Sequence, residues 1–445
     1  MKRVAMLFGC ALCLSCGRLF AGDGLPEPMR QWHQWRGPQA NGVAPHGNPP
    51  LEWSESKNVR WKVEIPGEGS STPIIWGDRI FLLTAIETDH VAKDVPAPAD
   101  QPKRPFGIVF PNRVHQFVVL CLDRKSGKTL WRHTANELVP HEGVHPDNDF
   151  ASASPVTDGR HLFASFGSRG IYCYTLSGEL KWQRDLGDMQ TRLSFGEGSS
   201  PVLHGDTLVT TWDHDGPSFI AALNALTGEV KWKKDRDEMS AWATPLIVTR
   251  DGRTQIVTNA SKRVRSYDLN TGELLWECGG QVGNVTPSPV ASGNLVYCMS
   301  GYRGSALYAL PLDGKGDLTG SDKIAWKHDR GTPYIPSPVL FDDRLYFVQS
   351  NDGILSSLDA ASGKTILERT RLPGIARVYA SPVGAAGQVY ITSRDGATLV
   401  FRHGTKFEVL ATNKLDDDID ASPAIVGDEL YLRGKKFLYC LAESR

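Results

Sequence analysis

Two histidines flank a glutamate in the stretch HEGVH, which runs from His141 to His145. On a helix, the pattern H-E-x-x-H binds zinc, because histidines four positions apart share one face and the glutamate acts on metal-bound water. Here Pro140 precedes the first histidine, Gly143 lies between the two, and Pro146 follows the second. Proline and glycine both disfavour a helix at these positions. The local sequence therefore predicts an irregular loop and not a zinc-protease helix.

An internal repeat surrounds this loop and must position it. A small or polar residue, then Ser or Thr, then Pro recurs eight times, at intervals of 82, 46, 44, 44, 49, 44 and 41 residues. Each copy continues with short apolar runs that are separated by turns such as TDGR, ASGN and LDRKSGK. Four short strands per roughly 44 residues is typical of a β-propeller blade. The repeat prolines are Pro73, Pro155, Pro201, Pro245, Pro289, Pro338, Pro382 and Pro423.

The fourth apolar run of most copies ends in a tryptophan. A large flat side chain at the same place in every blade can pack against the neighbouring blade and bury much apolar area. Leu367 takes this place in the sixth copy, and Cys121, Cys173 and Cys440 share one column of the third run, where a small apolar residue fits. The tryptophans predicted to dock adjacent blades are Trp61, Trp131, Trp182, Trp232, Trp276 and Trp326.

The two ends of the repeat region predict how the ring closes. The last copy stops after its third run, whereas an unpaired run, VRWKVEI, precedes the first copy. Joining them completes the last blade and hides both sheet edges. The sequence thus predicts an all-β, eight-bladed β-propeller with four-stranded antiparallel blades, closed by the N-terminal strand. We expect a signal peptide at 1–21, an N-terminal arm at 22–58, the propeller at 59–445, and top-face insertions at 86–116 and 136–150.

The first 21 residues have the pattern of an export signal. A short basic start precedes an apolar run at 4–14, which is too short to span a bilayer well. Two endings remain open: cleavage after Ala21, or lipid attachment at Cys16 within CLSCG, which resembles a bacterial lipobox. We expect an exported protein of the periplasm or cell envelope, either free or anchored to the outer membrane through a lipid.

Composition excludes several classes of partner. The 49 basic and 50 acidic residues give a net charge of −1, so no nucleic-acid surface is indicated. Eight cysteines become five without the signal, and an odd number argues against a full disulfide framework. We expect a monomer.

Strand order assigns the loops to faces. Connections from strand four to the next strand one, and from strand two to strand three, emerge together at one mouth of the channel, and such polar-aromatic hollows bind ligands. Two-to-three loops add Arg169, Arg303 and Arg394 there. The four-to-one loops supply the candidate binding residues Glu68, Asn148, Asp149, Arg192, Glu197, Trp242, Asn284, Tyr334, Arg377, Tyr379, Asp418 and Asp420. Weak metal candidates are His90, His115, His141 and His145 in the two insertions.

The repeat resembles a known family. Motifs such as NALTGEVKW, YDLNTGELLW and LDAASGKTIL, with WRGPQANGV near the start, are similar to the PQQ-like β-propeller repeat proteins of bacterial envelopes. That group is related to the outer-membrane assembly lipoprotein propeller and distantly to dehydrogenases that use pyrroloquinoline quinone (PQQ). The resemblance covers nearly the whole chain after the signal.

The dehydrogenase branch of this resemblance implies more than the repeat. It implies a vicinal cysteine pair against the quinone, a calcium site from Glu, Asn and Asp side chains, and a catalytic aspartate. Residues 22–445 contain no Cys-Cys pair, and the chain contains no C-x-x-C-H haem motif.

Three functions therefore compete. We expect an exported, non-catalytic propeller without a cofactor, which binds protein or glycan partners at its mouth and has no catalytic residue. The alternative is a PQQ-dependent alcohol or sugar dehydrogenase with calcium. A hydrolase or metalloenzyme that uses the histidine-containing insertions is the third, although no nucleophile motif supports it.

Overall fold

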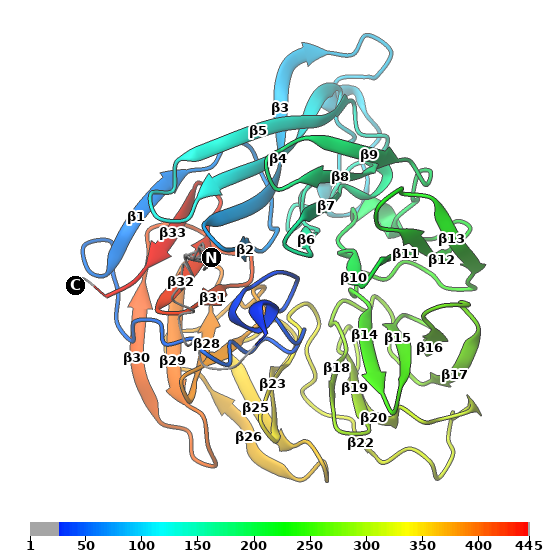
Figure 1. Ribbon diagram of the computed structural model, residues 1–445, viewed down its shortest axis with the longest axis vertical. Helices are drawn as coiled ribbons and strands as arrows, with labels where there is room; N and C mark the ends of the chain where they lie inside the picture. Colours follow the sequence, from blue (N-terminus) through cyan, green and yellow to red (C-terminus); the bar gives the residue numbers. More distant parts are fainter. Residues whose placement is uncertain (1–25, 444–445) are drawn as a thin grey trace, which may run out of the picture.

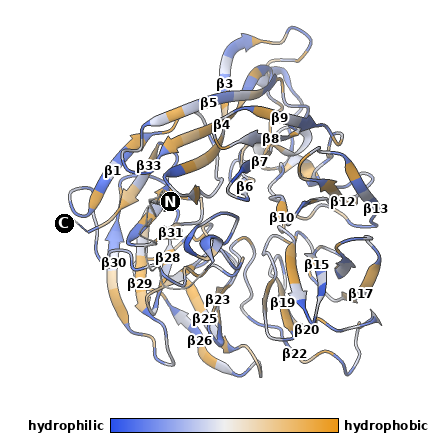
Figure 2. Cartoon of the chain, in the orientation of Figure 1, coloured by the Kyte–Doolittle hydropathy of each residue, from blue (hydrophilic) through white to orange (hydrophobic). Residues whose placement is uncertain are grey.

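The repeat folds into eight antiparallel sheets that surround a central axis (Figure 1). The computed structural model describes residues 26–443, so the predicted signal peptide and Cys16 lie outside the described residues. Hydrophobic residues lie mainly along the strands of the blades (Figure 2). Within residues 26–443, no helix is both long and apolar enough to cross a membrane.

Blades 1 to 4 follow one another along the chain, each with four strands in sequence order. They comprise β2 (Ile74–Trp76), β3 (Arg79–Val91), β4 (Arg113–Asp123) and β5 (Thr129–Leu138); β6 (Val156–Thr157), β7 (His161–Ser165), β8 (Ile171–Thr175) and β9 (Leu180–Arg184); β10 (Val202–His204), β11 (Thr207–Trp212), β12 (Phe219–Asn224) and β13 (Val230–Asp235); and β14 (Leu246–Arg250), β15 (Arg253–Asn259), β16 (Arg263–Asp268) and β17 (Leu274–Gly279).

Blades 5 to 8 continue the ring, and the last one recruits the first strand of the chain. They comprise β18 (Val290–Ser292), β19 (Leu295–Ser300), β20 (Ala306–Pro311) and β22 (Trp326–His328); β23 (Val339–Phe341), β24 (Arg344–Val348), β25 (Ile354–Asp359) and β26 (Thr365–Arg371); β27 (Val383–Ala385), β28 (Gln388–Thr392), β29 (Ala397–Arg402) and β30 (Val409–Lys414); and β31 (Ala424–Val426), β32 (Glu429–Arg433), β33 (Phe437–Leu441) and β1 (Val59–Glu64).

The predicted closure is confirmed. Strand β1 pairs with β33 in antiparallel register, with Trp61 opposite Cys440. The five cysteines of the described chain are buried and free, which agrees with a packing role. Burial raises the pKa of the Cys121, Cys173 and Cys440 thiols to about 12, so these thiols stay protonated at neutral pH.

The docking tryptophans contact the next blade as predicted. Five of the six indoles lie over a glycine with positive φ in the turn between strands three and four of that blade, and their Nε1 atoms donate to a nearby backbone carbonyl. Trp182, for example, donates to the carbonyl of Ala225 at 2.8 Å and covers Gly228. Trp276 differs: it donates to the Gln255 side chain at 3.3 Å. Beside it, the short strand β21 (Gly316–Asp317) adds in parallel to β17.

The Ser or Thr before each repeat proline forms a hydrogen-bonded circle around the axis. The backbone N–H of each of seven members donates to the hydroxyl of the next member at 2.9–3.1 Å. Thr72 completes the circle by donating its own hydroxyl to the carbonyl of Ser422 at 3.1 Å. All eight are buried. This hydroxyl ring comprises Thr72, Ser154, Ser200, Thr244, Ser288, Ser337, Ser381 and Ser422.

The N-terminal arm lies inside the ring, where the sequence did not place it (Figure 1). It begins with the 3-10 helix η1 (Glu27–Arg30) and runs past the innermost strands of successive blades. The guanidinium of Arg36 is buried and donates to the carbonyls of Pro338 and Pro382, both at 2.6 Å. Backbone hydrogen bonds join the arm to the inner strands in five pairs: Trp32 with Ile75, His33 with Thr157, Asn41 with Leu340, Ala44 with Gly384, and Asn48 with Gly427.

Strands extend into the start of both insertions. Strands β3 and β4 remain paired to Val91 and Arg113, and β5 continues to Leu138. The irregular parts are therefore 92–112, with η2 (Pro98–Asp100) and η3 (Pro105–Gly107), and 139–155. The HEGVH stretch is an irregular loop, as predicted. We call these two parts the flap and the crossing loop.

The tryptophan–glycine contact gives a stability prediction. A Cβ on Gly228 would lie 2.7 Å from the indole of Trp182, whereas a Cβ on Gly205 would meet no atom within 4 Å, and both glycines have positive φ. Gly205→Ala should therefore cost only backbone strain, about 1 kcal/mol. Gly228→Ala should cost ~2–4 kcal/mol, because overpacking adds to the strain. Urea unfolding of both variants measures the difference, and equal losses would contradict blade docking through this contact.

Candidate functional site

A cavity of about 490 Å³ lies at the mouth of the channel, on the predicted face. Hydroxyl-ring members and Trp35 of the arm form its inner end, where the Trp35 indole donates to the Ser288 hydroxyl at 3.2 Å. Trp242, Tyr302, Tyr334 and other aromatic side chains form its wall. We call this space the mouth cavity, lined by Trp35, Ser70, Phe106, His145, Asp147, Asn148, Ser152, Phe195, Gly198, Ser200, Trp242, Thr244, Thr286, Ser288, Tyr302, Arg303, Tyr334, Ile335, Ser337, Tyr379, Ser381, Asp420 and Ser422.

The flap and the crossing loop meet over this cavity. Phe106 at the tip of the flap packs on His145, with ring centroids 5.2 Å apart. Both rings also contact Phe195, at 5.3 and 5.1 Å. Burial lowers the pKa of the His145 imidazole, so this ring is neutral at neutral pH. The insertions thus form an aromatic roof over one side of the mouth.

One carboxylate ties the crossing loop to the far side of the ring. Asp147 accepts a hydrogen bond from Tyr379 at 2.9 Å and pairs with Arg394 of blade 7. Arg394 also makes a bidentate bond to Asp420, at 2.6 and 2.7 Å. Burial alone would raise the pKa of Asp147, but the hydrogen bonds from Arg394 and Tyr379 outweigh it and lower this pKa. Asp147 is therefore ionised, and the two carboxylates face two guanidiniums, because Arg377 also lies 3.5 Å from Asp147.

The hydroxyl ring presents donors to the cavity. Six members line it, and each hydroxyl oxygen accepts a backbone N–H. Across residues 26–443, no acceptor receives the hydroxyl hydrogens of these six side chains. Burial raises the pKa of Tyr334 and Tyr379, so their phenols also remain protonated donors. The inner end of the cavity is therefore rich in O–H donors from the hydroxyl ring, whereas the Tyr379 phenol already donates to Asp147.

The predicted site residues separate into two groups. Asn148, Trp242, Tyr334, Tyr379 and Asp420 line the mouth cavity together. The others lie on the same face but outside its lining. Glu68 borders a groove beside the flap, and Arg192 and Asn284 line a smaller neighbouring hollow. Asp149 and Glu197 are engaged behind the wall, Arg377 lies on the rim 3.5 Å from Asp147, and Asp418 is exposed.

Some lining residues were not among the site predictions. Asp147 stands beside the predicted Asn148, and Trp35 belongs to the WRGP motif of the arm. The hydroxyl ring was visible in the sequence as a repeat, but only its prolines were used. Phe106 and Phe195 had no signal, because each lies in an irregular segment outside the repeat pattern.

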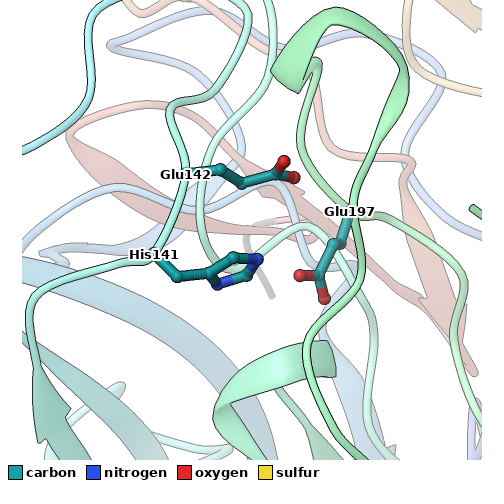
Figure 3. A group of neighbouring side chains, drawn as sticks. All are labelled: His141, Glu142 and Glu197. Atoms are coloured by element: carbon teal, nitrogen blue, oxygen red, sulfur yellow. The ribbon is translucent and has the colours of Figure 1, made fainter. Parts of the chain in front are cut away.

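One group of possible metal ligands includes the first two residues of HEGVH, His141 and Glu142. His141, Glu142 and Glu197 place ligand atoms within 4.8 Å of one another, and the first two extend from one loop toward Glu197 (Figure 3). Their atoms are already engaged. The His141 Nε2 lies 2.7 Å from the carbonyl of Met189, and Glu142 accepts bonds from Thr191. Burial raises the pKa of Glu142, which favours its protonated form.

Glu197 is held most firmly of the three. It pairs with the buried guanidinium of Arg169 at 2.6 Å and accepts two bonds from Ser168. A positive side chain on this carboxylate opposes a cation at the same place. His145 faces the aromatic roof, and His115 packs on Phe150 with centroids 5.2 Å apart, so the four histidine candidates do not converge. Thus the group in Figure 3 is a hydrogen-bonded support behind the cavity wall.

The residues also do not fit the quinone site of the dehydrogenases. Residues 22–445 have no adjacent cysteines, and Cys278 and Cys298 lie within strands β17 and β19, away from the cavity lining. Glu197, the acid nearest to a calcium ligand in type, is occupied by Arg169. The Asn148 amide donates to the carbonyl of Phe195 at 2.9 Å. We therefore derive no chemical step through PQQ or calcium.

Solved structures with this architecture have diverse titles. BamB from Moraxella catarrhalis has a TM-score of 0.51 at 12% identity, over 82% of this chain and 99% of that chain. The quinohemoprotein alcohol dehydrogenase ADHIIG from Pseudomonas putida HK5 has 0.57 at 9%, over 94% and 82%. The computationally designed Ika8 protein has 0.52 at 14%, over 75% and 95%. At these identities the likeness shows the fold alone.

Sequence comparison identifies the family more specifically. No curated protein sequence matches the chain significantly. The family described as outer membrane protein assembly factor BamB matches residues 115–369, which is more than half of the chain. The repeat, the eight-bladed closure and this match agree, and the chain belongs to the BamB-like family of PQQ-like β-propellers.

Proposed function

We propose that this protein is an exported, non-catalytic binding propeller of the cell envelope, which holds a group of its partner in the mouth cavity. The observation that carries this proposal is the cavity itself. Its size is that of a small-ligand site, and aromatic side chains with a few polar groups line it, as is typical of binding pockets. Its floor is made by the buried hydroxyl ring and Trp35, so the site is rigid at its inner end.

The charges in the cavity support binding over catalysis. A general acid or base needs a titratable group that is free to exchange a proton with the substrate. Asp147 and Asp420 are held by Arg394, and the pKa of Asp147 is lowered. The buried cysteine thiols are protonated and lie within the blades. These groups position the wall and the roof, and none of them is placed to act as a nucleophile.

Membership of the BamB-like family supports the cellular setting. The family is described as outer membrane protein assembly factor BamB, and the Moraxella catarrhalis structure also carries the name BamB. An envelope partner, either protein or glycan, agrees with that setting and with the export signal predicted at 1–21. The enclosed roof favours a partner that inserts a single group, such as one side chain or one terminal sugar, over a flat protein surface.

The contact between Asp147 and Arg394 should control access to the cavity. Asp147→Asn removes the charge that holds the crossing loop, and a hydrogen bond to a charged group is worth about 1.5–3 kcal/mol. We expect amides of residues 143–150 to lose protection from hydrogen exchange by about 10-fold at pH 7. Asp418→Asn, which changes an exposed carboxylate on the same face, is the control and should have no effect.

The pH dependence of this contact follows from the lowered pKa of Asp147. A lowered carboxyl pKa stabilises the closed loop above the unfolded value of 3.8, and this stabilisation is lost as pH falls through the folded value. Protection should therefore be constant from pH 5 to 8 and fall only below about pH 4. Loss of protection near pH 6 would show that another group holds the loop.

The non-catalytic assignment is tested with PQQ. We expect calorimetric titration of residues 22–445 with PQQ and Ca²⁺ to give no tight binding, and the same sample to reduce no dye with alcohols or sugars. The reason is that the carboxylate and amide nearest to a calcium site are already engaged by protein groups. Micromolar binding with turnover would replace the binding function by a quinoprotein dehydrogenase.

A further inference from the structure

The mouth cavity has one positive charge, that of Arg303, which no carboxylate of the described chain balances. The two cavity carboxylates, Asp147 and Asp420, face two guanidiniums, those of Arg394 and Arg377. Arg303 is exposed, lines the same cavity and lies 5.1 Å from the ring of Tyr302. Among residues 26–443, no carboxylate forms an ion pair with Arg303. A ligand with one negative charge at the rim would supply the missing partner.

The hydrogen-bond donors on the floor of the cavity favour a ligand that has acceptor oxygens. Six hydroxyl-ring members offer O–H donors that have no acceptor in the described chain. A buried polar group without a partner is costly, so the ligand or water that fills this end must accept hydrogen bonds. Several donors spread around a circle suit a ligand that carries oxygens around its edge.

The aromatic wall fits a puckered ring better than a flat one. Neighbouring rings in the wall are tilted against each other, by 34° for Phe195 and Trp242 and by 38° for Tyr302 and Tyr334. Phe106 and Phe195 are nearly perpendicular, at 72°. Such a wall is curved, whereas a flat aromatic ligand stacks best on flat faces. The apolar C–H face of a sugar ring can pack on a curved aromatic surface.

We infer that the group held in the mouth cavity is an acidic sugar residue of the uronate type. Its carboxylate would pair with Arg303 at the rim, its hydroxyl and ring oxygens would accept bonds from the hydroxyl ring, and its C–H face would pack on Trp242 and Tyr334. This inference rests on the proposed binding function and names its ligand class. It concerns binding only, and no bond is made or broken.

The test uses matched acidic and neutral sugars on residues 22–445. Calorimetric titrations with glucuronate and glucose, and with galacturonate and galactose, should show that each acid binds about 10-fold more tightly than its neutral partner at low salt. Arg303→Gln should remove this preference. Arg330→Gln changes an exposed arginine of the same face that does not line the cavity, and it should keep the preference. Added salt should weaken the preference in the unmodified protein.

The outcomes separate the ligand class from the function. Equal binding of acidic and neutral sugars, binding of neither, or a preference that survives Arg303→Gln would overturn the acidic-sugar assignment. The parallel titration with PQQ and dye reports on the binding function alone, because turnover there would overturn it whatever the sugars do. Acid preference that depends on Arg303, without turnover, supports both.

Discussion

The circle of Ser and Thr residues before the repeat prolines is the interaction on which the rest of the molecule depends. Each member lies two residues before the innermost strand of its blade, where the ladder of that sheet leaves its backbone N–H unpaired. The hydroxyl of the next member satisfies this N–H, so eight blades are joined at their inner edges by bonds of 2.9–3.1 Å. Proline follows because it has no N–H to satisfy and fixes an extended backbone.

The outer part of the ring is held by a different contact that repeats with the same period. An indole from one blade covers a glycine in the next, and its Nε1 satisfies a turn carbonyl there. The two sets of contacts act at different radii, so together they fix both the position and the tilt of the blades that carry a docking indole, whereas Leu367 takes that place in blade 6. Where the outer contact is altered, at Trp276, the chain adds β21 and a buried Gln255 to fill the same space.

The repeated features could be predicted from the sequence because periodicity reports burial. The blade number, the tryptophan contacts and the closure by β1 were all visible as spacing. For the site, the sequence could predict only which face of the propeller carries it. Loops have no side-chain period, so the sequence could not tell that Glu197 turns toward Arg169 while Trp242 lines the cavity. Nor could it pair Asp147 with Arg394, which lies 247 positions later.

The position of the arm inside the ring could not be predicted, for the same reason. Its residues carry no repeat, and its contacts are to strand edges that any extended chain could occupy. The role of Arg36 is visible only in the structure, where its guanidinium donates to two carbonyls of adjacent blades. Burial lowers the pKa of this guanidinium to about 9, which shows how fully the arm is enclosed.

The symmetric and asymmetric parts of the chain therefore have separate tasks in binding. Eight similar blades can build only a floor with similar donors in every direction, and such a floor cannot orient a ligand. Orientation must come from features that occur once: the flap with Phe106, the crossing loop with Asp147, and Arg303 in blade 5. The flap and the crossing loop arise from blade 1 and its link to blade 2, whereas the anchor Arg394 belongs to blade 7. A ligand below the roof is thus enclosed by segments from opposite ends of the repeat, and the ring must close before the site exists.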